Sequence, residues 1–238
     1  MDIAEVKMME AMAKLKPIND AIERGNSVVG KFYSGSTLFV TGGSGFIGKQ
    51  LIEKLFRSSN IKKLFVLCRQ KKGKTAQERL QSMLREPVFE SLLEKQPNFA
   101  DRVVAVDGDI TSIRLGLSDS DWKMLTEEVD VIFHVAATIR FDEPLRVATF
   151  TNVRGTRETL TLGRECSKLK SFVHVSTAFC HATKERIDTE LLEQFYPCPI
   201  SPDIMISMAE EVEESRLDNM TPALIANWPN TYTFTKTL

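Results

Sequence analysis

The 238-residue sequence contains no uninterrupted apolar run close to the roughly 18 residues that a transmembrane helix needs. It also contains no run of Lys and Arg long enough to form a patch for nucleic acid or a membrane surface, and its net charge is only -1. The N-terminus lacks a secretory hydrophobic core, and Asp2, Glu5 and Glu10 argue against a transit peptide. We therefore expect this chain by itself to be soluble and intracellular, with no nucleic-acid partner.

Cysteine and histidine are few and scattered. The four cysteines, none of which form a Cys-x-x-Cys pair, are Cys68, Cys166, Cys180 and Cys198. The three histidines, whose spacing gives no metal set, are His134, His174 and His181. The sequence therefore favours reduced thiols in an intracellular protein over disulfides or a zinc site. We expect no bound metal, and we expect the first two histidines to lie in strands.

What the sequence does contain is a regular alternation of short apolar runs and helical patterns. Five runs rich in Val, Ile and Phe are expected to be strands: STLFVTGG, KLFVLCR, RVVAVDGD, DVIFHVAA and SFVHVSTA. Segments with apolar residues at helical spacing separate them, such as FIGKQLIEKLFRSS and FTNVRGTRETLTLGREC. This pattern is typical of an α/β fold, a doubly wound parallel sheet with helices on both faces. We predict an NAD(P)-binding Rossmann domain over residues 36–238.

Two segments are harder to interpret. Residues 1–35 predict an amphipathic helical lead-in that is broken near Pro17. Residues 182–229 are irregular and proline-bearing, and they include the acidic stretch MAEEVEES. This second segment is either a solvated loop with a short helix or a part that faces the substrate, and the sequence leaves both interpretations open.

A glycine-rich turn follows the first expected strand. TGGSGFIG places Gly42, Gly45 and Gly48 between a strand and a helix, which is the context that a dinucleotide site requires. Gly42 permits the tight turn, Gly45 lets the backbone approach a pyrophosphate, and Gly48 lets the helix pack closely on the sheet; the N–H groups of the helix start would hold the phosphates. The alternative is an ordinary glycine-rich turn. The candidate cofactor residues of this turn are Thr41, Gly42, Ser44, Gly45, Phe46, Ile47 and Gly48.

The residues after the second expected strand bear on which dinucleotide binds. A site for NAD usually has Asp or Glu there, bonded to the ribose 2′-hydroxyl. This stretch, LCRQKKGK, has Arg69, Lys71 and Lys72 and no acid. A guanidinium suits a 2′-phosphate, which a carboxylate would repel. We therefore predict NADPH as the cofactor and Arg69 as the residue that contacts its 2′-phosphate. The alternative is that the basic residues after the strand are only solvated loop charges, and we favour this alternative for each of the two lysines.

The ends of the third and fourth expected strands supply further candidates. Asp109 and Ile110 follow the third strand in DGDI and are placed to frame the adenine. Ala136 and Ala137 end the fourth in HVAA, where small side chains let the nicotinamide ribose pass close to the backbone. The alternative for both pairs is plain packing at a strand end.

Near the end of the chain, PNTYTFTK contains a tyrosine and a lysine four residues apart. Pro229 fits just before a helix, on which Tyr232 and Lys236 would share one face. An ammonium beside a phenol favours the phenolate and makes the tyrosine a usable proton donor. VSTA ends the fifth strand, so Ser176 and Thr177 are two candidate hydroxyls for holding a substrate carbonyl.

Together with the glycine turn, the stretches HVAATIRFDE, NVRGTRE, FVHVSTAFC and PNTYTFTK resemble the fatty acyl-CoA reductases of the insect and plant male-sterility type. These belong to the extended short-chain dehydrogenase/reductase superfamily. The resemblance runs from about residue 33 to the last residue; the glycine and Tyr-x-x-x-Lys motifs occur across the superfamily, and the other three stretches are far more specific to the family.

The resemblance implies NADPH-dependent reduction of a long-chain acyl-CoA to a fatty alcohol through an aldehyde, with two NADPH consumed. By family role, Tyr232 would protonate the carbonyl oxygen, and Lys236 would assist the phenol and bind the nicotinamide ribose. The strand-five hydroxyl falls on Thr177 in our alignment, with Ser176 beside it, and the sequence does not decide between them. Asn152 matches a family position near the proton relay and the cofactor.

The resemblance also carries expectations about the rest of the protein. Family members add a C-terminal substrate region and often a membrane anchor, at the cytosolic face of the peroxisomal or endoplasmic-reticulum membrane. We therefore expect this chain to be an N-terminal fragment, with a fifth strand left at the sheet edge and weak activity by itself. The alternatives are another extended reductase or epimerase acting on a nucleotide-sugar, and an inactive cofactor-binding fragment.

Overall fold

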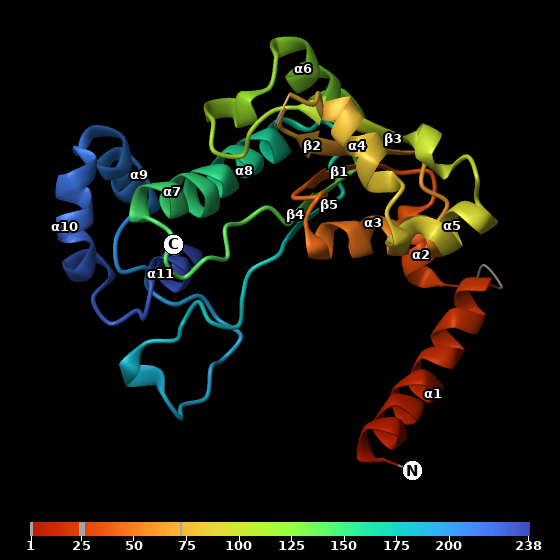
Figure 1. Ribbon diagram of the computed structural model, residues 1–238, viewed down its shortest axis with the longest axis horizontal. Helices are drawn as coiled ribbons and strands as arrows, with labels where there is room; N and C mark the ends of the chain where they lie inside the picture. The colour runs from red at the N-terminus through yellow and green to blue at the C-terminus, as the bar shows by residue number, and fades with distance from the viewer. Residues whose placement is uncertain (1, 24–26, 72) are drawn as a thin grey trace.

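The computed structural model describes residues 2–23, 27–71 and 73–238. Its centre is a five-stranded parallel sheet in the order β3–β2–β1–β4–β5, with helices on both faces (Figure 1). The strands are β1 (Thr37–Thr41), β2 (Lys63–Cys68), β3 (Val103–Asp107), β4 (Val131–His134) and β5 (Ser171–His174). The chain starts in the middle of the sheet, winds outward to β3 and then crosses back to β4. The structure confirms the predicted doubly wound parallel fold and all five predicted strands.

Helices alternate with the strands and cover the sheet. The α-helices from the glycine turn to β5 are α3 (Phe46–Ser58), α4 (Ala76–Leu84), α5 (Glu90–Lys95), α6 (Asp119–Glu128), α7 (Leu145–Ala148) and α8 (Gly155–Glu165). Short 3₁₀ segments are η1 (Pro87–Phe89), η2 (Phe99–Arg102), η3 (Ile113–Gly116) and η5 (Lys184–Arg186), and η4 (Thr149–Arg154) is π-helical. The sequence explains where several begin: Thr75 and Glu78 form a capping box on α4, and Ser118 caps α6.

The two faces of the sheet carry separate apolar cores. Successive strand residues point to opposite faces, so Leu38 and Val40 of β1 pack with α3, α4 and α5, whereas Phe39 between them packs with α6 and α8. Phe56 on α3 and Leu162 on α8 are fully buried against these opposite faces. Burial on both faces is why the strands are near-continuous apolar runs rather than alternating ones.

The N-terminal segment precedes this domain as α1 (Ile3–Glu23) and α2 (Val28–Tyr33). Figure 1 shows α1 extending away from the sheet, whereas the ring of Tyr33 on α2 lies 5.9 Å from that of Phe133 in β4. The expected break near Pro17 is wrong, because α1 continues through that residue. Proline removes one helical hydrogen bond, but Pro17 and Ala13 are both exposed, so water can satisfy the freed carbonyl.

The segment expected to be irregular, residues 182–229, is only partly so. Two helices occupy its second half, α9 (Pro202–Glu211) and α10 (Glu214–Ile225), followed by α11 (Thr231–Thr237). They share a small third core made of Leu145, Met205, Ala209, Leu217 and Phe234. The interpretation as a solvated loop with a short helix is therefore wrong: α9 and α10 form a helical layer beside α7 and η4, seen at the left of Figure 1.

Strand β5 lies at the edge of the sheet, as expected, and within the described residues no strand pairs with its outer side. Among those residues, no helix has both the length and the apolar character that a membrane crossing requires.

Candidate functional site

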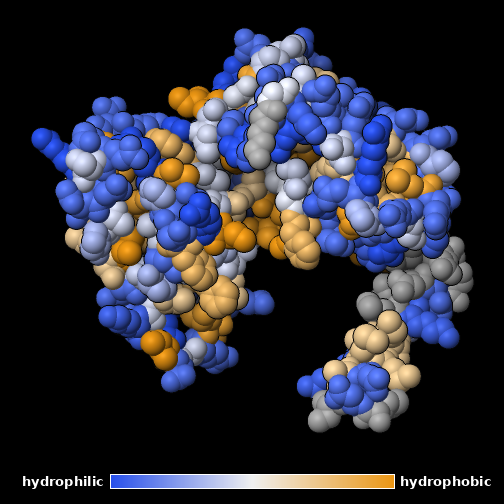
Figure 2. Space-filling model, viewed as in Figure 1, coloured by the Kyte–Doolittle hydropathy of each residue, from blue (hydrophilic) through white to orange (hydrophobic). Residues whose placement is uncertain are grey.

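A cavity of about 750 Å³ lies at the carboxyl ends of the strands. It is lined by the glycine turn, the ends of β2 and β3, the loop after β4, the end of β5 and helix α11. Strand β1 pairs with β2 on one side and β4 on the other, so the connections leave its two sides in opposite directions and open a crevice there. The space-filling view shows the surface hollowed between the sheet and the layer of α9–α11 (Figure 2).

The glycine turn forms one wall of this cavity, and its geometry requires glycine at two positions. Gly42 has φ +73°, and a Cβ there would lie 2.5 Å from the backbone nitrogen of Ala136. A Cβ on Gly48 would lie 2.2 Å from the carbonyl oxygen of Gly42. Gly45 differs, since a Cβ there would meet only that same oxygen at 3.2 Å and would otherwise stand in open space.

The bare backbone at Gly45 is the N-cap of α3, and Ser44, Phe46 and Ile47 line the cavity around it. The first N–H groups of a helix have no partner within the helix and attract anions. The turn therefore fits the pyrophosphate of a dinucleotide, as the sequence predicts.

The far end of the cavity is basic. Arg69 follows β2, is about half exposed, and has its Nη1 atom 3.5 Å from Oδ2 of Asp109. Lys71 and Arg79 line the same end, and the Arg79 guanidinium donates a hydrogen bond to the Arg69 carbonyl oxygen. Lys72 lies outside the described residues. Arg79 was missed by the sequence analysis; it is on α4, and a basic residue on the helix after strand two is the only signal that could have found it.

Asp109, which faces Arg69, and Ile110 also line the cavity. Partial burial works to raise the pKa of Asp109, but hydrogen bonds from the N–H and hydroxyl of Thr111 and the nearby Arg69 charge outweigh it and lower the pKa below its usual value. The carboxylate is therefore ionised at neutral pH, and both hydrogen bonds to Oδ1 hold it in place.

The middle of the cavity is lined by Ala136, Ala137 and Thr138 after β4. Asn152 is not among the lining residues; its amide instead clamps Thr138, accepting from the backbone N–H at 3.0 Å and donating to the carbonyl oxygen at 3.2 Å. The same amide donates to Thr235 Oγ1 on α11 at 3.0 Å. Asn152 thus joins the loop after β4 to the helix of Tyr232 from within the π-helical segment η4.

Thr41 is likewise placed behind the cavity rather than in its lining. It is fully buried at the end of β1, where its Oγ1 lies 2.7 Å from Nδ1 of His134 and accepts a hydrogen bond from the N–H of Ala136 at 3.3 Å. Its contact is with the strand that supports the cavity.

Helix α11 brings the tyrosine and lysine to the cavity together. Asn230 caps it by accepting a hydrogen bond from Thr233 N at 2.9 Å, and residues 231–236 are all buried. Such a short helix depends on packing for its stability. Tyr232 and Lys236 both line the cavity, as their spacing predicts.

Of the two strand-five hydroxyls, Ser176 lines the cavity and Thr177 does not. The Thr177 hydroxyl oxygen instead accepts a hydrogen bond from the N–H of Phe179 at 3.2 Å. The structure therefore brings Ser176 together with Tyr232 and Lys236, and it holds Thr177 one residue further along.

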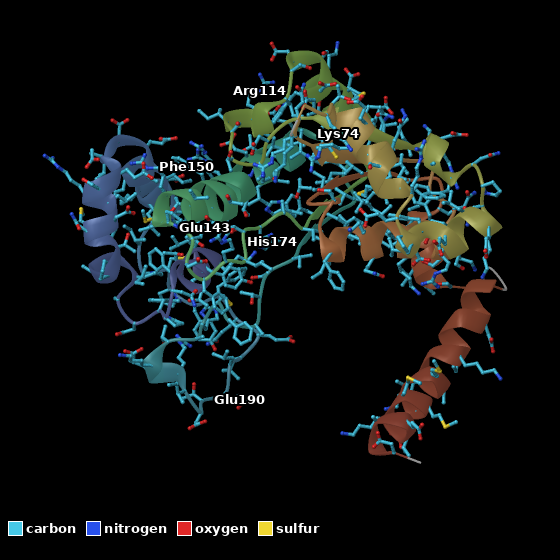
Figure 3. All side chains as sticks on the ribbon, viewed as in Figure 1. Lys74, Arg114, Glu143, Phe150, His174 and Glu190 are labelled. Atoms are coloured by element: carbon cyan, nitrogen blue, oxygen red, sulfur yellow. The ribbon has the colours of Figure 1, made fainter. Side chains whose placement is uncertain are left out.

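Two further residues near the tyrosine carried no site prediction, although both belong to the stretch HVAATIRFDE. The ring of Phe141 stacks on that of Tyr232, with centroids 5.7 Å apart. Glu143 lines the cavity (labelled in Figure 3), accepts from the Thr138 hydroxyl at 2.7 Å, and accepts from the Thr231 hydroxyl through its backbone oxygen at 2.7 Å. Both contacts depend on how the loop folds over α11, which spacing along the sequence cannot reveal.

Comparison with known proteins decides the family. Residues 40–238 match the profile of an NAD-binding domain described as "Male sterility protein". The chain belongs to the male sterility protein family. Membership confirms the family resemblance, and the NAD-binding profile supports a nicotinamide cofactor for this domain.

Curated relatives of this family carry reductase names. The chain is 40% identical over 213 residues to "Fatty acyl-CoA reductase 2" of Bos taurus, covering 89% of this chain and 41% of that protein. It is 37% identical over 237 residues to "Fatty acyl-CoA reductase wat" of Drosophila melanogaster, covering 98% of this chain and 45% of that protein. The chain thus spans about two fifths of the length of these relatives.

Solved structures show the same fold. The terminal R domain from the myxalamid PKS-NRPS biosynthetic pathway is 28% identical with a TM-score of 0.57, and the match covers 84% of this chain and 42% of that one. A thiolation-reductase di-domain from an archaeal non-ribosomal peptide synthetase, 20% identical, gives the same TM-score over 85% of this chain and 36% of that one. This second likeness concerns the fold alone.

Proposed function

We propose that the protein carrying this chain is an NADPH-dependent reductase that converts long-chain fatty acyl-CoA to fatty alcohol through an aldehyde. The observation that carries the proposal is that Tyr232, Lys236 and Ser176 line the same cavity as the glycine turn. The reductase names of the relatives support the substrate class.

The preference for NADPH over NADH rests on the charges at the basic end of the cavity. Arg69, Lys71 and Arg79 line it, and the end of β2 has no carboxylate of its own. Three cations favour a 2′-phosphate, and a guanidinium can bind one through two parallel hydrogen bonds. Asp109 faces Arg69 at 3.5 Å and leaves the guanidinium half exposed for this contact.

The residues at the opposite end handle the substrate carbonyl. When bound, NADPH supplies the hydride. Tyr232 donates the proton that the carbonyl oxygen takes up, the Lys236 ammonium stabilises the phenolate that remains, and a hydroxyl at the end of β5 orients the oxygen. Ser176 lines the cavity, which supports it for this last role, whereas the family resemblance favours Thr177. In the first reduction the C–S bond breaks and coenzyme A leaves as a thiolate, so no nucleophile from the chain is needed.

The surface beside Tyr232 suits an acyl chain. Ile139, Phe141 and Val147 are exposed apolar side chains, and Phe141 stacks directly on the tyrosine ring. Ile139 and Val147 also line the cavity. Apolar groups of this size left open to water are typical of a surface that binds an apolar ligand.

A titration and a product assay test the proposal on this chain. We expect NADPH to bind more tightly than NADH, and incubation with NADPH and palmitoyl-CoA at high protein concentration to give hexadecanal or hexadecanol by mass spectrometry. Because the chain spans about two fifths of its relatives' length, product identity rather than rate is the readout. Tyr232→Phe should retain cofactor binding and yield no product. Turnover of a nucleotide-sugar but not of acyl-CoA would contradict the proposal.

A further inference from the structure

Two histidines lie side by side beneath the catalytic lysine. His134 on β4 and His174 on β5 are register partners in the sheet, and their rings stack with centroids 5.1 Å apart and planes 21° apart. His134 is fully buried, whereas His174 is exposed and is the last residue of β5 (labelled in Figure 3). The reductase chemistry proposed above uses neither ring.

The hydrogen bonds of His134 specify one neutral form. The hydroxyl of Thr156 donates to the carbonyl oxygen of Asn152 at 2.6 Å, so its oxygen accepts from the Nε2–H of His134 at 2.9 Å. The ring's other nitrogen, Nδ1, then accepts from the hydroxyl of Thr41 at 2.7 Å. Both nitrogens are therefore occupied, and the ring carries a single proton.

His174 presents its Nε2 to the lysine. That nitrogen lies 3.5 Å from Nζ of Lys236, which also donates to the carbonyl oxygen of Val175 at 3.1 Å. An ammonium has three donors and no acceptor, so Nε2 can contribute only as an acceptor, with the ring neutral and its proton on Nδ1. The ammonium is thus held between an imidazole nitrogen and a backbone carbonyl, both at the end of β5.

The groups facing this pair favour the neutral state. His134 faces His174 from β4, Lys236 faces it from α11, and the thiol of Cys180 faces Lys236 from the loop after β5. Within residues 2–23, 27–71 and 73–238, no carboxylate forms an ion pair with Lys236.

The pKa directions agree with this arrangement. Partial burial and then the Lys236 charge lower the pKa of His174 to about 4. Burial, then the charges of His174 and Lys236, lower the pKa of His134 to about 3. Burial also lowers the pKa of Lys236. At neutral pH both rings are therefore uncharged.

We propose that His174 is a positioning residue for Lys236: its neutral ring, backed by His134, accepts a hydrogen bond from the ammonium and with the Val175 carbonyl fixes it beside Tyr232. The catalytic meaning of this role rests on the proposed reductase function, whereas the contact itself does not. Removing the acceptor should leave a buried ammonium with one partner fewer, which disfavours its charged form.

Nuclear magnetic resonance of this chain tests the contact without any turnover. In protein with ¹⁵N-labelled histidine, the two-bond imidazole correlations of His174 should show a protonated Nδ1 and an unprotonated Nε2 from neutral pH down to about pH 5. In protein with ¹³C-labelled lysine, assigned through Lys236→Arg, the pKa of Lys236 should fall in His174→Phe, which keeps the stacked ring and removes the acceptor.

Matched variants separate positioning from packing. His174→Gln restores an acceptor and should return the Lys236 titration toward that of the unmutated chain, and His181→Phe, whose ring packs on Tyr196, should leave it unchanged. In an assay that detects reduction, His174→Phe should lower kcat by on the order of tenfold with a smaller effect on the KM for acyl-CoA.

A protonated Nε2 on His174 in the unmutated chain would overturn the proposal, even if His174→Phe failed to fold. So would a Lys236 titration that is the same in His174→Phe and His181→Phe. If Lys236 responds as expected while a nucleotide-sugar and not acyl-CoA is turned over, the proposed function fails and the positioning role stands. If acyl-CoA is reduced but the Lys236 titration does not change in His174→Phe, the positioning role fails and the proposed function stands.

Discussion

Replacing Gly48 with alanine should destabilise the fold through a clash with backbone atoms. The added Cβ would lie 2.2 Å from the carbonyl oxygen of Gly42 and 2.6 Å from the Cα of Gly43, so α3 must move away from the sheet. Overpacking of this kind costs about 1–3 kcal/mol, and the gain from removing a helical glycine offsets about 0.5–1 kcal/mol of it. A net loss of about 1–2 kcal/mol corresponds to a fall in Tm of roughly 2–8 °C for a domain of this size.

Gly45→Ala is the matched control three residues earlier. Gly45 has φ −80° and ψ 174°, which any residue adopts, and its added Cβ would meet only the Gly42 carbonyl oxygen at 3.2 Å. The fold should therefore keep its Tm to within a few degrees. The methyl group would nevertheless stand where the pyrophosphate approaches, so the Kd for NADPH should rise at least about tenfold, or about 1.4 kcal/mol.

The two effects are measured by circular dichroism during heating and by titration of NADPH fluorescence. The glycine turn as described requires that Gly48→Ala lose stability and that Gly45→Ala lose cofactor. If Gly48→Ala kept the Tm of the unmutated chain, the close packing of α3 on the turn would be refuted. If Gly45→Ala bound NADPH as before, the pyrophosphate does not approach at this point.

Further predictions concern charge, catalysis and pH. Arg69→Asp should reverse the order of the Kd values, so that NADH binds better than NADPH. The binding free energy of NADPH should fall by about 1.5 kcal/mol, the low end for a charge-assisted contact, because the site is exposed. Equal Kd values for both cofactors in the unmutated chain would refute the assignment. Lys236→Ala should weaken cofactor binding and abolish reduction, whereas Tyr232→Phe should abolish reduction alone, as titration and product analysis would reveal. Because burial and the charges of His174 and Lys236 lower the pKa of His134 to about 3, unfolding favours proton uptake below pH 6.5. The neutral His134 ring contributes to the free energy of unfolding in full above pH 6.5. This contribution should be lost as the pH falls toward 3, by up to about 1.4 kcal/mol per pH unit. Urea unfolding at pH 7 and pH 5 should therefore show a shallower pH dependence in His134→Gln, and an unchanged slope would argue against a buried neutral ring.

The strands and the glycine turn could be predicted from sequence because their signals are local. Runs such as STLFVTGG are apolar on both faces of the sheet, and the requirement for glycine at Gly42 and Gly48 follows from the turn itself. The pairing of Tyr232 and Lys236 in one cavity follows from helical spacing and from the cap at Asn230.

The parts that could not be predicted depend on contacts between distant segments. Helices α9 and α10 bury Met205 and Leu217 against Leu145 and Phe234, a core that no local pattern reveals, and their prolines favoured a loop interpretation. Whether Ser176 or a neighbour lines the cavity depends on how the backbone turns after β5. The domain boundary at residue 36 and the individual site roles stay predictions.

Isotope transfer from the cofactor tests the central claim most directly. The protein is incubated with palmitoyl-CoA and NADPH carrying deuterium at both C4 positions, and the extracted products are analysed by mass spectrometry. The account predicts hexadecanol with two deuterium atoms at C1, or hexadecanal with one where the reaction stops at the aldehyde. Unlabelled product, or deuterium transferred to a sugar nucleotide and never to the acyl carbon, would contradict it.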